Sequence, residues 1–295
     1  MIKLHDIINT MNVQEIDTNL FTGQALDLGL PRVFGGQVLG QSLNAAARTI
    51  DQARQPHSLH GYFLRPGDIT RPIIYEVDPI RDGRSFSTRR VVGKQKGRAI
   101  FNASISFQKR EDGLSHQIDL PGDIPRPDQI VSDALKAKEI VAATPGLNLK
   151  KILQFYLIFG LDIVDLRTPH LPQILSSEPL EPVFGFWFKF SDDIGDDPVL
   201  HRTLLAFISD KALMSVSLRP HGTSFNTHNI IGASLDHAMW FHTEIRVNQW
   251  IYYHIESPRS ARARGLNHGK FYTEDGELIA STAQEGLIRV IGPKE

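Results

Sequence analysis

The sequence contains no cysteine among its 295 residues, which excludes disulfide bonds, thiolate nucleophiles and metal sites with cysteine ligands. No apolar run is long enough to span a bilayer, and the N-terminal segment MIKLHDIINT lacks the apolar core of a signal peptide. Neither charge is in excess, since 32 lysines and arginines stand against 33 aspartates and glutamates. These absences predict a cytoplasmic protein with no nucleic-acid partner and no membrane partner.

Apolar periodicity in the first half of the chain predicts one strand, one long helix and four further strands. The expected elements are a strand over residues 13–23, a helix from about Gln37 to Ile50, and strands over 58–66, 72–80, 85–94 and 98–108. Turn residues, such as the pairs at 66–67 and 82–83, separate the strands. This order predicts an α+β unit in which an antiparallel sheet wraps around one long central helix.

The same order returns in the second half, so the sequence carries a degenerate internal repeat. A helix is expected over 197–214, and strands over 160–167, 182–190, 213–220, 234–242, 249–257, 263–273 and 277–290. The segment GRAIFNASISF (97–107) aligns without gaps with GELIASTAQEG (276–286). Residues 111–155 are expected to be a linker with a short exposed helix over 128–141. The expected domains are therefore 1–110 and 156–295, packed as a pseudo-dimer with a continuous sheet.

The helix expected over 197–214 carries an aspartate at an unusual place. Asp197 and Pro198 are suited to the N-cap and the first helical position. Asp210 shares a surface strip with large apolar residues, where an ionised carboxylate is costly unless it is hydrogen-bonded, protonated or functional. A second interpretation is that Asp210 lies at the edge of the strip and meets solvent or Lys211.

A glycine pair, Gly35 and Gly36, precedes the Ala-rich helix of the first half. Glycines at a helix start let another group approach the free backbone N–H donors, so these two are candidate oxyanion donors. The alternative is that they serve close packing of the helix against other elements.

Comparison of the two copies singles out an acid, a hydroxyl and an amide in the second copy. The aligned pairs are Asp210 with Gln41, or with Ser42 if the register slips by one, Ser234 with Ser58, and Gln284 with Ile105. Only the hydroxyl is kept in the first copy. A carboxylate can deprotonate a water molecule, while a hydroxyl and an amide can fix its direction of attack. The pattern predicts one water-activating site per chain, with Asp210 as general base.

Six segments spread along nearly the whole chain are distinctive when taken together: FGGQVLGQSLNAAART, HSLHGYFLRPGD, DGRSFSTRRV, SLRPHG, ASLDHAMWFH and ASTAQEGLIR. They resemble the acyl-CoA thioesterase II family, whose members contain two hotdog domains in one chain. The resemblance implies hydrolysis of acyl-CoA thioesters to free fatty acid and CoA, without a cofactor, a metal or a covalent intermediate. The Asp, the Thr or Ser, and the Gln that polarise the water in this family fall on Asp210, Ser234 and Gln284.

Other polar residues are weaker candidates. His60 and His237 are candidate substrate-binding groups or bases, although Asp236 cannot easily pair with His237, because strand neighbours point to opposite faces. Arginines could bind the CoA phosphates or form a solvated rim, and the candidates are Arg89, Arg90, Arg262 and Arg264. The histidines lack metal-ligand spacing, and no Gly-x-Ser-x-Gly motif is present.

Two other functions compete with thioester hydrolysis. One is a hotdog enoyl-CoA hydratase with His60 or His237 as the base, and the other is a non-catalytic acyl-CoA-binding protein. Loss of the site in one copy with retention in the other favours a single active site. The expected partner is acyl-CoA, and a homodimer or a homotetramer is expected because each sheet leaves a face free for pairing.

Overall fold

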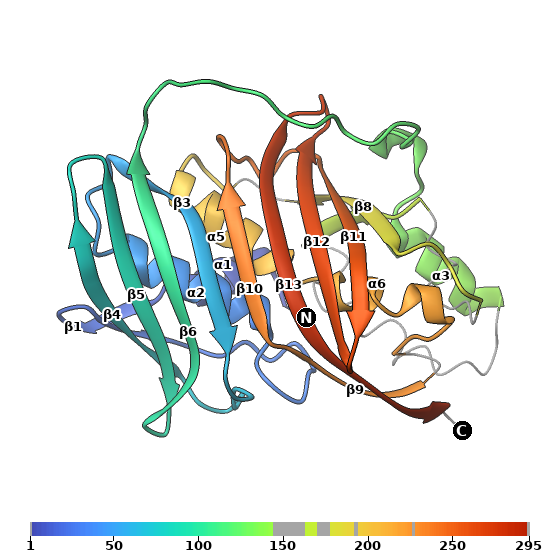
Figure 1. Cartoon of the computed structure of the whole chain (residues 1–295), viewed down its shortest axis with the longest axis horizontal. Coiled ribbons are helices and arrows are strands. Elements are labelled where there is room, and N and C mark those ends of the chain that lie inside the picture. The colour runs from blue at the N-terminus through green and yellow to red at the C-terminus, as the bar shows by residue number, and fades with distance from the viewer. Residues whose placement is uncertain (1, 144–162, 170–177, 192–193, 226–227, 294–295) are drawn as a thin grey trace.

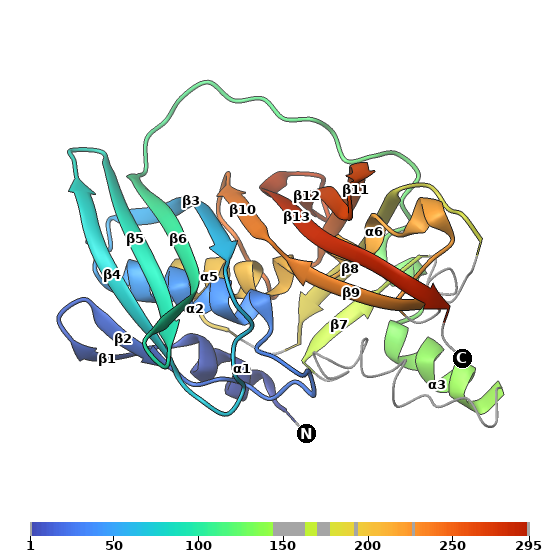
Figure 2. The same cartoon turned by 60° about the horizontal axis from the view of Figure 1, so that its bottom comes forward.

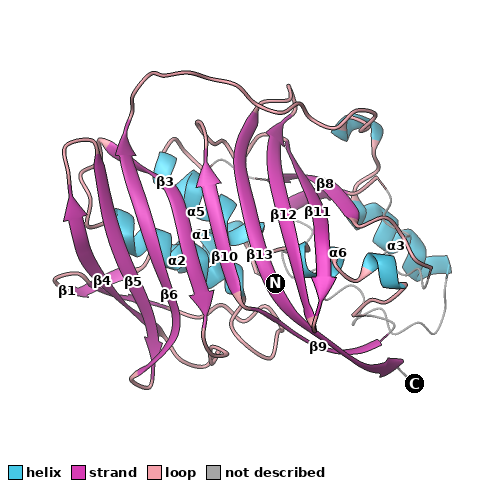
Figure 3. Cartoon of the chain, in the orientation of Figure 1, coloured by secondary structure: helices cyan, strands magenta, loops and turns pink. Residues whose placement is uncertain are grey.

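The computed structural model describes residues 2–143, 163–169, 178–191, 194–225 and 228–293. The first half contains α1 (Leu4–Met11), β1 (Gln14–Asp17), β2 (Leu20–Gly23), α2 (Gly35–Ala47), β3 (Arg54–Phe63), β4 (Ile73–Asp82), β5 (Phe86–Gln95) and β6 (Arg98–Lys109). The second half contains β7 (Val164–Arg167), β8 (Val183–Phe190), α5 (Pro198–Ser209), α6 (Leu213–Val216), β9 (His228–Ser234), β10 (Asp236–Phe241), β11 (Ile251–Ala261), β12 (Arg264–Thr273) and β13 (Leu278–Pro293). Figure 3 shows the helices gathered behind one broad sheet.

The strands form one continuous antiparallel sheet whose order is the same when read from either end. The order is β1-β2-β4-β5-β6-β3 in the first half, followed by β10-β13-β12-β11-β8-β7 in the second (Figure 1). The halves meet where β3 pairs with β10, with Leu59 opposite Met239. The expected repeat is therefore present in the topology, since each strand of one half has a counterpart at the mirrored place in the other. Strand β9 lies off this order and pairs with the far end of β13.

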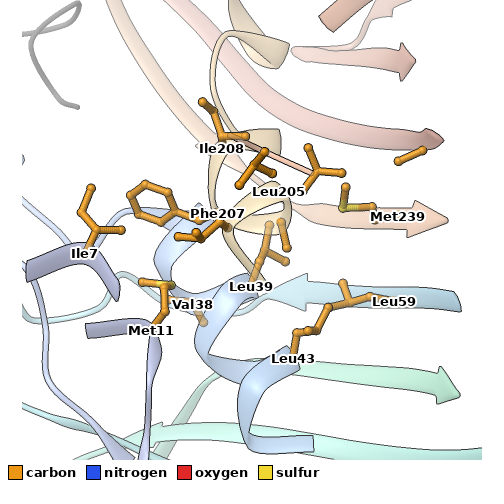
Figure 4. Packing of buried hydrophobic residues seen from close by; sticks show 14 of the residues in the cluster. Ile7, Met11, Val38, Leu39, Leu43, Leu59, Leu205, Phe207, Ile208 and Met239 are labelled. Atoms are coloured by element: carbon orange, nitrogen blue, oxygen red, sulfur yellow. The ribbon is translucent and has the colours of Figure 1, made fainter. Parts of the chain in front are cut away.

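The two long helices pack against each other in the middle of the molecule. Within α2, the residues from Gly36 to Ala46 are buried, and α5 is buried from His201 to Ser209. A Cβ atom at Gly36 would overlap the carbonyl oxygen of Phe207, and one at Gly40 would lie 3.1 Å from that of Thr203. Glycine is therefore needed here for the close approach of the two backbones. Figure 4 shows the core at this crossing, where Leu39 of α2 and Leu205 of α5 belong to one buried cluster that includes residues of both halves.

Several local predictions differ from the structure. Residues 13–23 form a hairpin rather than one strand, because Asn19 turns the chain with a left-handed φ of 57°. The helix expected over 197–214 ends at Ser209, and residues 213–220, expected as a strand, form the short helix α6 followed by a 3₁₀ turn at Arg219–His221. Helix α1 and strand β9 were not expected.

A long connector joins the two halves. After β6, residues 111–126 form no helix or strand and run past the ends of the strands to the far side of the second half (Figure 2). A 3₁₀ turn (Pro127–Gln129) and helix α3 (Asp133–Ala143) follow. The expected linker helix is thus present but starts later than 128. Residues 144–155 of the expected linker, 156–162 of the expected second domain and the first three residues of the strand expected over 160–167 lie outside the described residues.

Candidate active site

Asp210 occupies the C-cap of α5 rather than a helical strip. The helix ends at Ser209, and Ala212 follows with a left-handed φ of 69°, which redirects the chain into α6. This break turns the Asp210 side chain toward the N-terminal end of α2. The first-half residue aligned with it, Gln41, is fully buried and hydrogen-bonded to the Tyr75 hydroxyl and to two backbone carbonyls.

Three donors from three separate elements converge on the Asp210 carboxylate. The amide Nε2 of Gln284, from β13, donates to Oδ1 at 2.6 Å. The hydroxyl of Ser234, the last residue of β9, donates to the same oxygen over a longer 3.4 Å. The backbone N–H of Gly36 donates to Oδ2 at 3.1 Å. The acid, the hydroxyl and the amide singled out from the sequence therefore lie within contact of one another.

Burial raises the pKa of Asp210 from 3.8 to about 6. Loss of hydration disfavours the charged form, whereas the donors from Gln284, Gly36 and Ser234 and the charge of Arg32 favour it and limit the rise in pKa. The carboxylate is therefore ionised near neutral pH and is more basic than a solvated aspartate. A general base with these properties is suited to removing a proton from water.

Asp210, Ser234 and Gln284 lie in the wall of a cavity of about 520 Å³. Both halves contribute to it, and most of its lining is apolar, including Phe63, Phe101 and Met214. Two exposed arginines, Arg32 and Arg65, also line the cavity. Each guanidinium group donates a hydrogen bond to a backbone carbonyl: Arg32 to that of Gly232 at 2.6 Å, and Arg65 to that of Ala99 at 2.7 Å.

The two glycines at the start of α2 have different surroundings. Gly35 lines the cavity at the first position of the helix, where an N–H has no acceptor within the helix. Gly36 instead donates its N–H to the Asp210 carboxylate, so this donor is already occupied. Close packing, the alternative considered from the sequence, also applies, because Gly36 contacts Phe207 of α5.

The two candidate histidines lie outside the cavity. His60 is exposed on the outer face of β3 and packs edge-on against Trp240, with ring centroids 5.0 Å apart. The prediction that His60 lies at the site is therefore wrong, because the strand register turns its side chain away from the helices. His237, on β10, is 1 % exposed and lies behind Gln284, to which its Nδ1 is bonded at 3.1 Å. Neither placement suits the base of a hydratase.

The four candidate arginines lie away from the cavity lining. Arg89 is buried and donates to Thr49 and Asp82, and Arg90 pairs with Asp78 on the neighbouring strand. Arg262 is exposed in the two-residue turn between β11 and β12, and Arg264 pairs with Glu285. None of these four lines this cavity, whereas Arg32 and Arg65 do, and the proposed role of the four in phosphate binding stays a prediction.

Two cationic residues of the cavity lining, Arg32 and Arg65, were not among the candidates from the sequence. Arg32 lies three residues before the glycine pair, and this proximity was the available signal. Arg65 lies near the end of the strand expected over 58–66, and no pattern set it apart from the other residues of that strand. Among the described residues, no group of three or more acidic, histidine or cysteine side chains is arranged to hold a metal ion. In the same part of the chain, every helix is too short or too polar to cross a membrane.

Comparisons with known proteins agree with the geometry. The model of the family "Acyl-CoA thioesterase" matches residues 182–287, and that of "Acyl-CoA thioesterase N-terminal domain" matches 26–108. Acyl-coenzyme A thioesterase 8 of Mus musculus is 35 % identical over 288 residues, which are 96 % of this chain and 89 % of that protein.

Solved structures give the same result. The crystal structure of the acyl-CoA thioesterase II TesB2 from Mycobacterium marinum superposes with a TM-score of 0.77 and 36 % identity, covering 96 % of this chain and 98 % of that one. A protein of Alicyclobacillus acidocaldarius described as having a hot dog fold superposes with a TM-score of 0.74 over 97 % of this chain and 98 % of that one. Its identity is 18 %, so this second likeness concerns the fold alone.

Proposed function

The chain belongs to the acyl-CoA thioesterase II family and hydrolyses acyl-CoA thioesters, and we propose that Asp210, Ser234 and Gln284 activate the attacking water. The observation that carries this proposal is the convergence of Gln284, Ser234 and Gly36 on one carboxylate in the wall of an apolar cavity. An apolar cavity suits an acyl chain, and a poorly hydrated carboxylate suits a general base.

Asp210 accepts a proton from the water as the water oxygen attacks the thioester carbonyl carbon. The amide oxygen of Gln284 accepts a hydrogen bond from the second proton of the water, and the Ser234 hydroxyl, whose bond to Asp210 is long at 3.4 Å, turns to donate to the water oxygen. These two contacts hold the water in line with that carbon, which is the orienting contribution of the site. When the tetrahedral intermediate collapses, the C–S bond breaks and Asp210 returns the proton to the departing CoA thiolate. No covalent bond to the protein forms at any step.

Gly35 is the proposed donor to the oxyanion of the tetrahedral intermediate. It lines the cavity, its N–H is at the start of α2, and the helix dipole favours negative charge there. A side chain at this position would also collide with the base, since a Cβ atom at Gly35 would lie 2.6 Å from Oδ2 of Asp210. Glycine is thus required both for substrate approach and for the position of the carboxylate.

Substrate binding divides between the apolar lining and the two cationic groups. The acyl chain lies among Phe63, Phe101 and Met214, and the CoA phosphates lie near Arg32 and Arg65. A guanidinium group donates to phosphate oxygens in a planar, bidentate manner, which suits this role.

The assembly of the chain is part of the same proposal. Residues 1–110 and 156–295 form two hotdog domains joined by the linker 111–155, and they pack as a pseudo-dimer. The mirrored strand order supports this arrangement. One working site remains because Gln41, aligned with Asp210, is buried and bonded to Tyr75. A cytoplasmic homodimer or homotetramer is proposed, which light scattering on the purified protein tests.

A thiol-release assay across acyl-CoA chain lengths tests the mechanism. Asp210→Asn is expected to abolish turnover while circular dichroism and the apparent mass stay unchanged. Ser234→Ala and Gln284→Leu are expected to lower kcat more than they raise KM, because both residues orient the water. Gln41→Leu is the matched control for a buried amide outside the cavity. Full turnover by folded Asp210→Asn would reject the proposed role of Asp210.

A further inference from the structure

His237 is a fully buried titratable residue that the proposed mechanism does not use. It is 1 % exposed, and burial lowers the pKa of its ring to about 3, so the ring is neutral at any pH at which the protein works. A neutral imidazole has one N–H donor and one acceptor nitrogen, and the identity of the donor depends on the hydrogen-bond partners.

Two hydroxyl groups determine which ring nitrogen carries the proton. Nε2 of His237 lies 3.0 Å from the hydroxyl of Ser209 and 3.0 Å from that of Thr282. Both hydroxyls donate their proton to a backbone carbonyl. Ser209 donates to the carbonyl of Ala206 at 2.8 Å, and Thr282 donates to that of Ala238 at 2.7 Å. They can therefore only accept from His237, which places the proton on Nε2 and leaves Nδ1 as an acceptor.

The acceptor on Nδ1 in turn determines the orientation of the Gln284 amide. The Nε2 atom of Gln284 has two protons, and it lies 2.6 Å from Oδ1 of Asp210 and 3.1 Å from Nδ1 of His237. If the amide were flipped, its oxygen would face two acceptors, the carboxylate and the imidazole nitrogen. That arrangement is unfavourable for both contacts.

We propose that His237 is a positioning residue, which holds Gln284 so that its NH₂ group faces Asp210 and its carbonyl oxygen faces the attacking water. The hydroxyls of Ser209 and Thr282 fix the tautomer, His237 transmits it to Gln284, and Gln284 stabilises the ionised form of Asp210. This inference rests on the proposed role of Asp210 as base. It assigns a function to a residue that never contacts the substrate.

The other titratable groups near Asp210 and His237 do not explain the orientation of Gln284. Arg32 is the charged residue that acts on Asp210, and its effect is to favour the ionised carboxylate. Tyr253 donates its hydroxyl to the carbonyl of Ser209, and its raised pKa keeps it neutral. Neither group contacts His237 through a hydrogen bond in the described part of the chain, so replacing His237 leaves both effects on Asp210 in place.

Two substitutions of His237 separate positioning from packing. His237→Leu removes the acceptor, whereas His237→Asn keeps an oxygen near the place of Nδ1 that can accept from Gln284. For His237→Leu we expect kcat to fall about tenfold and the acidic limb of the pH-rate profile to move up by about one pH unit, because Asp210 loses a well-oriented charged hydrogen bond. KM is expected to change by less than about threefold. His237→Asn is expected to restore most of both losses.

A second variant tests the tautomer and stays informative if His237→Leu does not fold. The double variant Ser209→Ala with Thr282→Val removes both acceptors from Nε2–H while leaving His237 in place. We expect the ring proton to move to Nδ1, as read by NMR of protein labelled in the histidine ring nitrogens, and the acidic limb to move upward. His242→Leu is the control, since His242 also bonds a strand hydroxyl, that of Ser281 at 2.9 Å, but this contact does not lead to Gln284.

The outcomes are distinguishable from failure of the catalytic proposal. Folded His237→Leu with an unchanged acidic limb and unchanged kcat would overturn the positioning role, and so would equal impairment of His237→Asn and His237→Leu. An unchanged tautomer and pH profile in the double variant would overturn it as well. Turnover by Asp210→Asn would instead remove the premise, while an inactive Asp210→Asn with unaffected His237 variants would leave the catalytic proposal intact.

Discussion

Replacement of Asp210 by asparagine is expected to remove activity and to become more favourable to the folded state as the pH rises. The carboxylate is costly in its place, since burial raises its pKa from 3.8 to about 6. A carboxyl group whose folded pKa is raised favours the folded state only in its protonated form. As the pH rises from 3.8 through 6, the folded protein therefore loses stability relative to the unfolded chain.

The size of this loss follows from the shift in pKa. A rise of about two units corresponds to about 3 kcal/mol at a pH above both pKa values. This figure is an upper bound, because Asp210 lines the cavity and its carboxylate can keep a water molecule there. Asparagine also presents an NH₂ group to one of the three donors, which costs about 1–2 kcal/mol at every pH. The difference between variant and wild type thus has a constant part and a part that depends on pH.

Urea unfolding followed by tryptophan fluorescence at about pH 4 and about pH 7 separates the two parts. The stability of Asp210→Asn relative to wild type is expected to increase by about 1–3 kcal/mol from the lower to the higher pH. Asp68→Asn is the control, because hydrogen bonds from Thr70 lower the pKa of Asp68 from 3.8, so its carboxylate is ionised in both states over this range and its relative stability is expected to change little between the two pH values. A relative stability of Asp210→Asn that does not change between the two pH values would refute the desolvation of this carboxylate.

Three other predictions concern the substrate cavity and the helix crossing. Arg32→Ala and Arg65→Ala are each expected to raise KM for acyl-CoA about tenfold, because each removes a guanidinium group that binds phosphate. KM for acyl-N-acetylcysteamine, which has no phosphate, is expected to stay unchanged. Arg90→Ala, outside the cavity lining, is the control and is expected to leave both KM values unchanged. Phe63→Ala is expected to increase kcat/KM for long acyl chains relative to short ones, because it enlarges the cavity that Phe63 lines. An unchanged ranking across chain lengths would contradict the placement of the acyl chain. Gly36→Ala is expected to lower the free energy of unfolding by about 1–3 kcal/mol through overlap with Phe207, whereas Gly113→Ala, which meets nothing within 4 Å, should have no effect in the same urea titration.

The sequence predicted most of the element order because the strands alternate and the two long helices carry apolar residues at helical spacing. The strand expected over 98–108 is observed as Arg98–Lys109, and the helix expected from about Gln37 starts two residues earlier, at Gly35. Comparison of the two copies also selected Asp210, Ser234 and Gln284, which the structure brings together. Their selection needed only the loss of an acid and an amide in one copy.

The local environment of the site was less accessible from sequence. The apolar run continues from α5 into α6, so the pattern gave no sign that the helix stops at Ser209, and the left-handed Ala212 is not a glycine. The outward direction of His60 depends on strand register, which a pattern of small and polar residues leaves open. The link from His237 to Ser209 and Thr282 joins three elements, and local spacing carries no information about such contacts.

The joint between β3 and β10 determines how the cavity depends on concentration. Each half alone would expose one of these strands as an unpaired edge and would lack part of the cavity lining, since Phe63 and Gly35 come from one half and Asp210 from the other. Because the connector keeps both halves in one chain, the second half is always present at a high effective concentration. Dilution that would separate two unlinked subunits therefore leaves this joint closed, and Gly35 and Asp210, the proposed oxyanion donor and base, stay together at any protein concentration.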